Sequence, residues 1–340
     1  MSLLDAFLRD AWQQPVVRSD VYFADRTDSA VGLGSHDDPY NGNDSKVPGN
    51  FDAKLNSVPA NTTIRIGPGT FKTKGTTGWA PKSGQRVVGA GVNETTLLVA
   101  AAPTGNTAAI GNPDSPPALD GFEASDLTIN CDFGNNPNAT SIGGIAVNGT
   151  HVAIRRGRVL GFGSRSSSTV CRVIAAARSA DTALATDCVI EGCIVDSPYI
   201  PPPDPPATVG PVTCLHLGKT TDADDYYHKA CGIRNCFVDC GAANLGNKFV
   251  GIEASGGGGT VVEENRIINC HYGGPYQDGT NIPTKDLVVR GNYYYNVRYG
   301  IYLSVPSSIS PIGRVVLLEN EVELDTTGTL EGLRIHGANT

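Results

Sequence analysis

Five short segments of this sequence share one pattern: a small residue, an apolar residue, a variable residue and a second apolar residue. They begin at Gly144, Cys214, Gly251, Gly300 and Gly332. Alternate residues of a strand point to opposite faces, so the apolar positions would face a core and the variable position would face outward. The variable positions are Ala146, His216, Glu253, Tyr302 and Arg334. This outward column would bring an imidazole, a carboxylate, a phenol and a guanidinium onto one face.

Two further segments would place polar and aromatic side chains beside this column. Residues 222–228 include three aspartates, two tyrosines and a histidine, and residues 271–278 read His-Tyr-Gly-Gly-Pro-Tyr-Gln-Asp. Tyrosines next to carboxylates suit a sugar, because aromatic faces stack on its ring while acids bind its hydroxyls. The sequence therefore predicts a saccharide-binding surface. Its predicted substrate-binding residues are His216, Asp224, Asp225, Tyr226, Tyr227, Tyr276, Tyr302 and Arg334.

Glu253 and Asp278 are the candidate catalytic residues. We expect them on neighbouring coils, where their carboxyl groups would fall within the about 5–9.5 Å that acid-base hydrolysis of a glycosidic bond uses. Two alternatives stay open, namely saccharide binding without cleavage and ordinary solvated acids of an acidic protein. His216 and His228 are further candidates for a base.

Six longer stretches can be superimposed, and they predict the elements that carry these side chains. Each has apolar residues at fixed distances before and after a reference residue; the reference residues are Gly157, Cys193, Cys236, Asn265, Asn292 and Asn320. Apolar positions two apart indicate strands, and the change of phase across the reference residue indicates a tight bend. Repetition every 27–43 residues is typical of a solenoid whose coils bury their inner faces against one another.

One position of this bend alternates in charge from unit to unit. Its residues are Arg155, Glu191, Arg234, Glu263 and Arg290. Stacked strands lie about 4.8 Å apart, so each side chain would sit between opposite charges in an exposed column, where ion pairs contribute about 0–1 kcal/mol each. A second column, made of the reference residues from Cys193 onward, is expected to satisfy the buried backbone of the bend.

The chain also resembles a known superfamily over about residues 50–340. The run Ala60-Asn-Thr-Thr-Ile-Arg-Ile-Gly-Pro-Gly-Thr-Phe71, followed by Val87-Val-Gly-Ala-Gly-Val-Asn-Glu-Thr-Thr-Leu97, is similar to the opening coils of pectin-lyase-like proteins. The resemblance implies an all-β fold, a right-handed parallel β-helix (solenoid). It implies no particular reaction, because the superfamily includes polysaccharide lyases, glycoside hydrolases, phage tailspikes and proteins without chemistry. The calcium-binding aspartates of the lyases and the paired aspartates of polygalacturonases have no clear counterpart here.

The composition of the chain disfavours several classes of binding partner. The net charge of −8 disfavours nucleic acid, and no stretch approaches 18 apolar residues, so no membrane span is expected. The nine cysteines include no C-x-x-C pair. We expect them to be free buried thiols, typical of a chain made in a reducing cytosol, with some stacked pairs close enough to oxidise. No zinc-type spacing occurs, so neither a metal nor a cofactor is predicted.

The first 50 residues are predicted to differ from the rest. Residues 1–12 have apolar side chains at helical spacing, but Asp5 and Asp10 interrupt any signal-type core and no cleavage site is recognisable. We expect residues 1–50 to form a helix, a strand and a polar linker for docking or capping, and residues 51–340 to form the β-helix. An uncovered last coil at residues 331–340 implies either that the chain is a fragment of a longer protein or that a neighbouring subunit covers this end. Together with the apolar helix, it favours a homotrimer, and residues 1–15 would alternatively dock onto a virion or baseplate.

Three functions fit these expectations. The favoured one is a phage-type tail fibre or tailspike-like protein that recognises cell-surface polysaccharide, made in the cytoplasm and located in the virion or outside the cell. It explains the free cysteines, the missing signal peptide and the apolar helix. The alternatives are a secreted polysaccharide lyase or glycoside hydrolase, which would need an export route, and a purely structural fibre protein.

Overall fold

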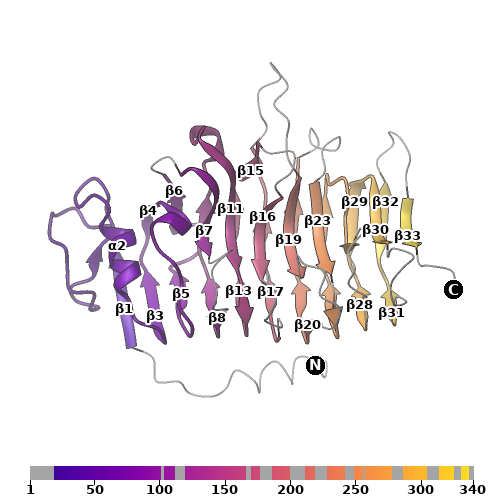
Figure 1. Ribbon diagram of the computed structural model, residues 1–340, viewed down its shortest axis with the longest axis horizontal. Coiled ribbons are helices and arrows are strands. Elements are labelled where there is room, and N and C mark those ends of the chain that lie inside the picture. Colours follow the sequence, from indigo (N-terminus) through magenta and orange to yellow (C-terminus); the bar gives the residue numbers. More distant parts are fainter. Residues whose placement is uncertain are drawn as a thin grey trace.

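The computed structural model describes residues 19–100, 103–111, 119–165, 170–176, 186–199, 211–218, 228–241, 249–255, 257–277, 286–304, 314–324 and 331–336. These residues form an elongated right-handed parallel β-helix (Figure 1), which confirms the predicted fold. Three long sheets run along the molecule, and each coil contributes a strand to them in turn. Only β11 and β15 pair in antiparallel fashion among the described strands of these sheets.

The first sheet has eleven strands and carries the alternating charges. Its members are β1 (Ser19–Ala24), β2 (Tyr40–Asn41), β3 (Thr62–Ile66), β5 (Arg86–Gly89), β9 (Glu123–Ser125), β13 (Ala153–Arg155), β17 (Val189–Glu191), β21 (Gly232–Arg234), β25 (Val261–Glu263), β28 (Leu287–Arg290) and β31 (Val315–Leu318).

The second sheet has nine strands and follows the bend after each strand of the first. Its members are β4 (Gly69–Thr73), β6 (Thr95–Val99), β10 (Thr128–Asn130), β14 (Arg158–Leu160), β18 (Ile194–Val195), β22 (Phe237–Asp239), β26 (Arg266–Ile268), β29 (Tyr293–Val297) and β32 (Glu321–Leu324).

The third sheet carries the predicted chemical groups. Its members are β7 (Gly105–Gly111), β11 (Ala139–Val147), β15 (Gly163–Ser164), β16 (Cys171–Ala176), β19 (Val212–Gly218), β23 (Phe249–Ser255), β27 (Tyr276–Gln277), β30 (Tyr299–Ser304) and β33 (Glu331–His336). Two short pairs lie outside the long sheets. They are β8 (Leu119–Asp120) with β12 (Gly149–Thr150), and β20 (His228–Lys229) with β24 (Gly257–Gly258).

The N-terminal end of the solenoid is closed by the helix α2 (Asn50–Ser57). Its Phe51 ring packs 5.3 Å from that of Phe23 and 5.2 Å from that of Phe71. The 3-10 turns η1 (Gly75–Thr77) and η2 (Phe133–Asn135) are the other helical elements described. The strand expected within residues 1–50 is β1, but it is not separate from the repeat. It pairs in parallel with β3, so the first sheet begins before the expected boundary at residue 51.

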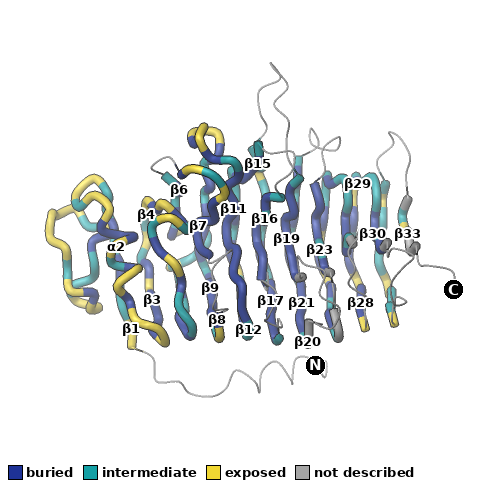
Figure 2. The backbone as a smooth tube through the Cα atoms, viewed as in Figure 1, coloured by how far each residue is buried: buried dark blue, intermediate teal, exposed yellow. Residues whose placement is uncertain are grey.

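The interior is a continuous apolar core built from the predicted strand positions. The side chains that point inward from the first sheet, among them Ile154, Ile190 and Ile233, are fully buried. Figure 2 shows this burial along the middle coils, while the loops at the N-terminal end are exposed. The register pairs Ile154 with Ile190 and Ile190 with Ile233, as the sequence alignment predicted. Each coil therefore buries its inner face against the next one.

The bends between the first and second sheets require left-handed backbone. The residue that follows each strand of the first sheet has positive φ in six successive coils. These residues are Arg156 (47°), Gly192 (61°), Asn235 (53°), Glu264 (54°), Gly291 (61°) and Glu319 (52°). One residue in this conformation reverses the direction in which side chains point, which explains the change of phase that the sequence showed at the reference residue.

The asparagine column inside the bend is present as predicted. Asn292 Nδ2 donates to Val262 O at 2.9 Å, and Asn292 Oδ1 accepts from Asn265 N at 3.0 Å and from Asn265 Nδ2 at 2.9 Å. Asn320 repeats the pattern one coil later, with its Nδ2 donating to Val289 O at 2.9 Å. Each amide therefore bonds backbone of the coil before it and links to the next amide, which satisfies buried polar groups of the bend.

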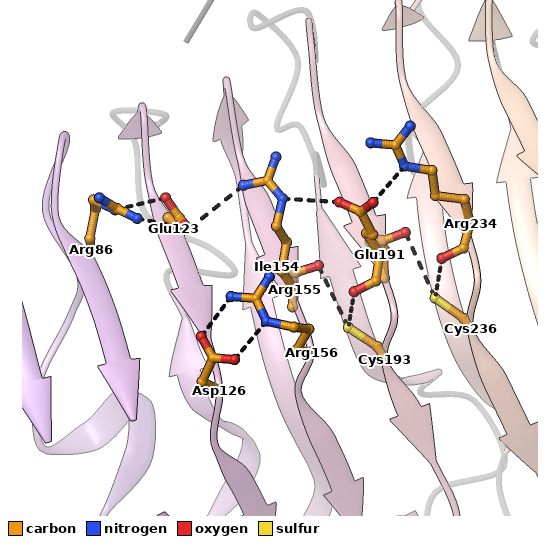
Figure 3. Close-up of polar contacts among 11 residues, drawn as sticks. Arg86, Glu123, Asp126, Ile154, Arg155, Arg156, Glu191, Cys193, Arg234 and Cys236 are labelled. Carbon is orange, nitrogen blue, oxygen red and sulfur yellow. Dashed lines mark hydrogen bonds and ion pairs between the residues drawn. The ribbon is translucent and has the colours of Figure 1, made fainter. Parts of the chain in front are cut away.

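The alternating charges form the predicted ladder, but it is more buried than expected. Figure 3 shows Glu191 between Arg155 and Arg234, with both nitrogen–oxygen distances 3.1 Å. Arg290 Nε donates to Glu263 Oε2 at 2.6 Å. The expectation of an exposed column was wrong for Glu263, which is only 6% exposed. Loss of the ion-pair partner destabilises a buried carboxylate more than a solvated one.

The cysteines agree with the prediction of free buried thiols. All nine are free and buried. The expected N-terminal helix and its proposed docking segment at residues 1–15 lie outside the described residues. No helix in the described part of the chain combines the length and apolar character needed to cross a membrane.

Candidate functional site

The outward column of the third sheet is a single row across successive strands. The register pairs Ala146 with Ala175, Ala175 with His216, His216 with Glu253, Glu253 with Tyr276, Tyr276 with Tyr302 and Tyr302 with Arg334. The strands β16, β19, β23, β30 and β33 follow one another toward the C-terminal end in Figure 1. We call this row the outer row.

Exposure along the outer row changes from one end to the other. Ala146 and Ala175 form a small apolar cluster apart from the main core, and His216 is 0% exposed. His216 was expected to be exposed, and this was wrong. Its neighbours Leu215 and Leu217 belong to the main core, so alternation points the imidazole to the outer side. The outer side is therefore shielded from solvent at β16 and β19, and it becomes partly exposed only from Glu253 onward.

Four tyrosines gather at the partly exposed end of the outer row. Tyr272 lies 4.2 Å from Tyr276, and its ring stacks on that of Tyr299 with centroids 5.0 Å apart. Tyr276 in turn stacks on Tyr302 at 5.4 Å. His271 extends the group, with its ring 4.6 Å from Tyr272. We call Tyr272, Tyr276, Tyr299 and Tyr302 the tyrosine cluster.

Isolated backbone bridges fix the place of two of these rings. Tyr272 pairs with Val250 on one side and with Tyr299 on the other, which brings the segment before β27 into the same sheet. All four tyrosines are half-buried, so each ring packs on its neighbours while part of its surface stays accessible. Such rings combine an apolar face with a polar hydroxyl at the edge.

Glu253 is held at the border between the shielded and the exposed parts of the outer row. Its Oε2 accepts a hydrogen bond from Thr213 Oγ1 at 3.0 Å and lies 3.1 Å from His216 Nδ1. Its side chain is 19% exposed. The carboxylate was expected to project freely into solvent, and the structure instead fixes it through two neighbours on β19.

The electrostatic surroundings keep Glu253 ionised. Burial acts to raise the pKa of its carboxyl, but the positive charge and hydrogen bond of His216, the charge of Arg172 and the hydrogen bond from Thr213 outweigh burial. Together they lower the pKa of Glu253 to about 2. A carboxylate with so low a pKa suits the roles of hydrogen-bond acceptor, base or nucleophile, and it does not suit the role of general acid near neutral pH.

Several predicted site residues cannot be placed against this geometry. Asp278, the expected partner of Glu253, lies outside the described residues, as do Asp224, Asp225, Tyr226 and Tyr227. Arg334 is placed by its backbone alone, in register with Tyr302. The structure thus brings together His216, Glu253, Tyr276 and Tyr302 from the predicted set.

Sequence reasoning missed three contributors. Thr213 and Arg172 pair in the register, and both act on Glu253, yet neither stands in the pattern that defined the column. Tyr299 comes one residue before the Gly300 pattern and was not aligned with it. Its proximity to Tyr302 in the sequence Tyr-Gly-Ile-Tyr was the available signal. No group of three or more metal-ligating side chains occurs among the residues that the structure describes.

Comparison with known proteins gives the architecture and no more. No protein-family model matches the chain, and no curated protein matches it. The chain is similar to the endo-xylogalacturonan hydrolase of Aspergillus tubingensis, with 14% identity, 81% of this chain and 70% of that chain covered, and a TM-score of 0.47. It is also similar to the alginate lyase of Paenibacillus sp. str. FPU-7, with 12% identity, 85% and 96% covered, and a TM-score of 0.42.

A third similar structure is ORF18 of Geobacillus virus E2, with 15% identity, 74% of this chain and 44% of that chain covered, and a TM-score of 0.26. At these identities and TM-scores the activities of the three proteins do not carry over to this chain. The three parallel sheets and their register are those of a right-handed parallel β-helix, the fold that the sequence resemblance implied.

Proposed function

We propose that this protein recognises polysaccharide through the tyrosine cluster and the neighbouring Glu253. The observation that carries the proposal is the packing of four half-exposed tyrosine rings, with centroids 4.2–5.8 Å apart, beside a fixed carboxylate. The ring faces match the apolar face of a pyranose, and the ionised Glu253 accepts hydrogen bonds from sugar hydroxyls. Rings already packed on one another lose little conformational freedom on binding, which favours affinity.

Coil spacing supports a linear ligand. Tyr276 and Tyr302 stand on adjacent strands of the outer row, with ring centroids 5.4 Å apart along the solenoid. A linear polysaccharide that lies along this row would therefore present its successive sugar units to successive coils. Ala146 and Ala175, nearer the N-terminal end of the outer row, have no ring to offer a sugar. Aromatic contacts with the ligand would therefore be confined to the C-terminal part of the row.

The biological setting that we propose is a phage-type tail fibre or tailspike that binds cell-surface polysaccharide as a homotrimer. The nine free cysteines and the elongated parallel solenoid support this setting. The alternative is a polysaccharide lyase or glycoside hydrolase, and the polar contacts of Glu253 with His216 and Thr213 favour it as the second candidate. In that case the ionised Glu253 would act as base or nucleophile, and another group would act as acid.

A binding experiment separates these possibilities. The purified chain is screened on a glycan array to find the best ligand. The Kd of that ligand is then measured by calorimetry for the wild type and for Tyr272→Ala, Tyr299→Ala and Tyr302→Ala. Each substitution removes a stacking ring, so we expect Kd to rise about tenfold or more, a loss of about 1.4 kcal/mol. Reducing-end and unsaturated-product assays with the same ligand test for cleavage.

Tyr295→Ala is the matched control. Tyr295 is also a tyrosine of these coils and is 45% exposed, but it belongs to the second sheet. Unchanged affinity in the three cluster variants, or an equal loss in Tyr295→Ala, would refute binding at the tyrosine cluster. Product formation that Glu253→Gln abolishes would establish the enzyme instead of the non-catalytic binder.

A further inference from the structure

We propose that Cys240 and Cys270 form an oxidative modification site, where a small-molecule disulfide converts the two thiols into a bond between successive coils. The inference rests on the interior of the solenoid and is independent of carbohydrate binding.

The two sulfur atoms are already close. Cys240 directly follows β22 and Cys270 lies two residues after β26, and these strands are neighbours in the second sheet. Cys240 Sγ lies 2.7 Å from Cys270 Sγ. A disulfide has a sulfur–sulfur bond of about 2.0 Å, so the bond needs an approach of about 0.7 Å.

Two further pairs of stacked cysteines, Cys188 with Cys231 and Cys193 with Cys236, also have hydrogen-bonded side chains. Cys193 Sγ lies 3.6 Å from Ile154 O, and Cys236 Sγ lies 3.3 Å from Arg234 O. These thiols donate to carbonyl oxygens of the bend and so replace the amides of the asparagine column. Cys214 Sγ is the second sulfur near Cys240, but at 3.6 Å it is farther away than Cys270. The 2.7 Å separation therefore makes Cys270, and not Cys214, the partner of Cys240 in the proposed bond.

The reaction is a thiol–disulfide exchange with glutathione disulfide. One cysteine thiolate attacks a sulfur of glutathione disulfide, the bond between the two glutathione sulfurs breaks, and one glutathione leaves as its thiolate, so that the cysteine is held in a mixed disulfide with the other glutathione. The second cysteine then attacks the mixed disulfide and displaces the second glutathione. The two protein thiols are oxidised, glutathione disulfide is reduced, and the two protons end on the released glutathione thiols.

The surroundings of the pair make the reaction slow in the folded protein. Both thiols are fully buried, and burial raises the pKa of Cys240 and of Cys270. Since the thiolate is the attacking species, exchange should accelerate as the pH rises. It should also be faster while the chain refolds, before the second sheet closes over the thiols.

The bond would lie on the inner side of the coils that carry the tyrosine cluster. Cys270 directly precedes His271 and Tyr272, and Cys214 directly follows Thr213 on β19. A link between Cys240 and Cys270 closes a loop across one coil, with the two residues 30 positions apart. Closing such a loop restricts the unfolded chain and stabilises the folded one.

The test uses the full chain. One sample is refolded from urea in a mixture of reduced and oxidised glutathione. A second sample is incubated with the same mixture in the folded state at pH 8.5. Both samples are then unfolded and alkylated. We expect a product lighter by two hydrogens with seven alkylatable thiols, and a cross-linked peptide that contains Cys240 and Cys270. The oxidised protein should also unfold at a higher temperature than the reduced protein.

Single variants locate the bond. Cys240→Ala and Cys270→Ala should keep all their remaining thiols reduced under the same treatment. Cys193→Ala and Cys214→Ala should still form the bond. Nine alkylated thiols in the treated wild-type chain, or a cross-linked peptide that joins Cys240 to Cys214, would overturn the proposal even if a variant fails to fold.

Discussion

At the scale of single residues, the chemistry of the site centres on Glu253. Burial strongly disfavours an ionised carboxylate. Here the interactions with His216, Thr213 and Arg172 outweigh burial and lower the pKa of Glu253 to about 2. Such a group contributes to the stability of the fold. The contacts that fix the carboxylate also connect β23 to β19, so under the proposed function the ligand-binding group would stabilise the fold as well.

The pKa of Glu253 predicts a specific pH dependence of stability. Its ordinary value is 4.5 and its folded value is about 2, so the contribution is complete above pH 4.5 and is lost as the pH falls toward 2. The difference of about 2.5 pH units corresponds to about 3 kcal/mol. We expect Glu253→Gln to be less stable than wild type at pH 7, and the gap to shrink between pH 4.5 and 2.

Urea unfolding of wild type and Glu253→Gln across this pH range measures the difference between their free energies of unfolding. Glu264→Gln, at an exposed position of the first bend, is the control for the removal of one carboxylate. A gap between wild type and Glu253→Gln that stays constant from pH 7 to pH 2 would show that Glu253 does not titrate as its surroundings require.

Residue-scale prediction from the sequence succeeded for register and failed for exposure. Strand alternation correctly placed His216, Glu253 and Tyr302 in one row, because alternation depends only on the local backbone. It could not predict that His216 is 0% exposed, because shielding on the outer side depends on packing beyond the sheet. Tyr299 was missed for a related reason. Its contact with Tyr272 arises through a single bridge, which no repeat pattern encodes.

At the scale of elements, the two columns of the first bend hold the coils in register. The sequence predicted both columns, since charged residues of alternating sign and a cysteine or asparagine recur at fixed distances from the strands of successive coils. It missed Arg86 and Glu123, which extend the charged ladder with a 2.8 Å ion pair. In the register Arg155 pairs with Ser125 and reaches Glu123 only diagonally, at 3.6 Å. A shift of two residues hides such a contact from an alignment of columns.

The asparagine column makes a prediction about Asn292→Leu. The substitution leaves Val262 O and the donors of Asn265 without the partners that Asn292 supplies. Each unpaired buried group costs about 1–3 kcal/mol. We expect the free energy of unfolding to fall by at least about 2 kcal/mol in a urea titration, equally at low and high salt. A loss below about 0.5 kcal/mol would mean that the column does not satisfy the bend.

The charged ladder makes a contrasting prediction about Glu263→Arg. The substitution places three guanidinium groups in succession, because Glu263 pairs with Arg234 and Arg290 in the register. Since Glu263 is buried and Arg290 is half exposed, the cost should lie between the about 0–1 kcal/mol of exposed pairs and the about 3–5 kcal/mol of buried ones. Unlike Asn292→Leu, the loss should shrink in 1 M salt, because salt screens the repulsion. Equal losses at both salt concentrations would contradict an electrostatic ladder.

At the scale of the whole molecule, the described coils close differently at their two ends. The helix α2 covers the first coil with buried Phe51 and Leu55. Near the other end, Leu318 and Leu333 are 50% and 54% exposed. They line a cavity of about 380 Å³ together with Ile301, Leu317 and Val322. Exposed leucines around a hollow of this kind favour association, which is consistent with the homotrimer proposed above.

The proposed homotrimer predicts a mass in solution. Light scattering on the eluting full chain should report three times 35.5 kDa, and deletion of residues 1–15 should lower the mass if the apolar stripe of that segment joins the copies. Leu318→Asp with Leu333→Asp should weaken association as well, because charged side chains at an apolar contact must give up their hydration. If the full chain and both variants each show the mass of a single chain, the trimer is excluded. Polysaccharide recognition would then belong to a single solenoid.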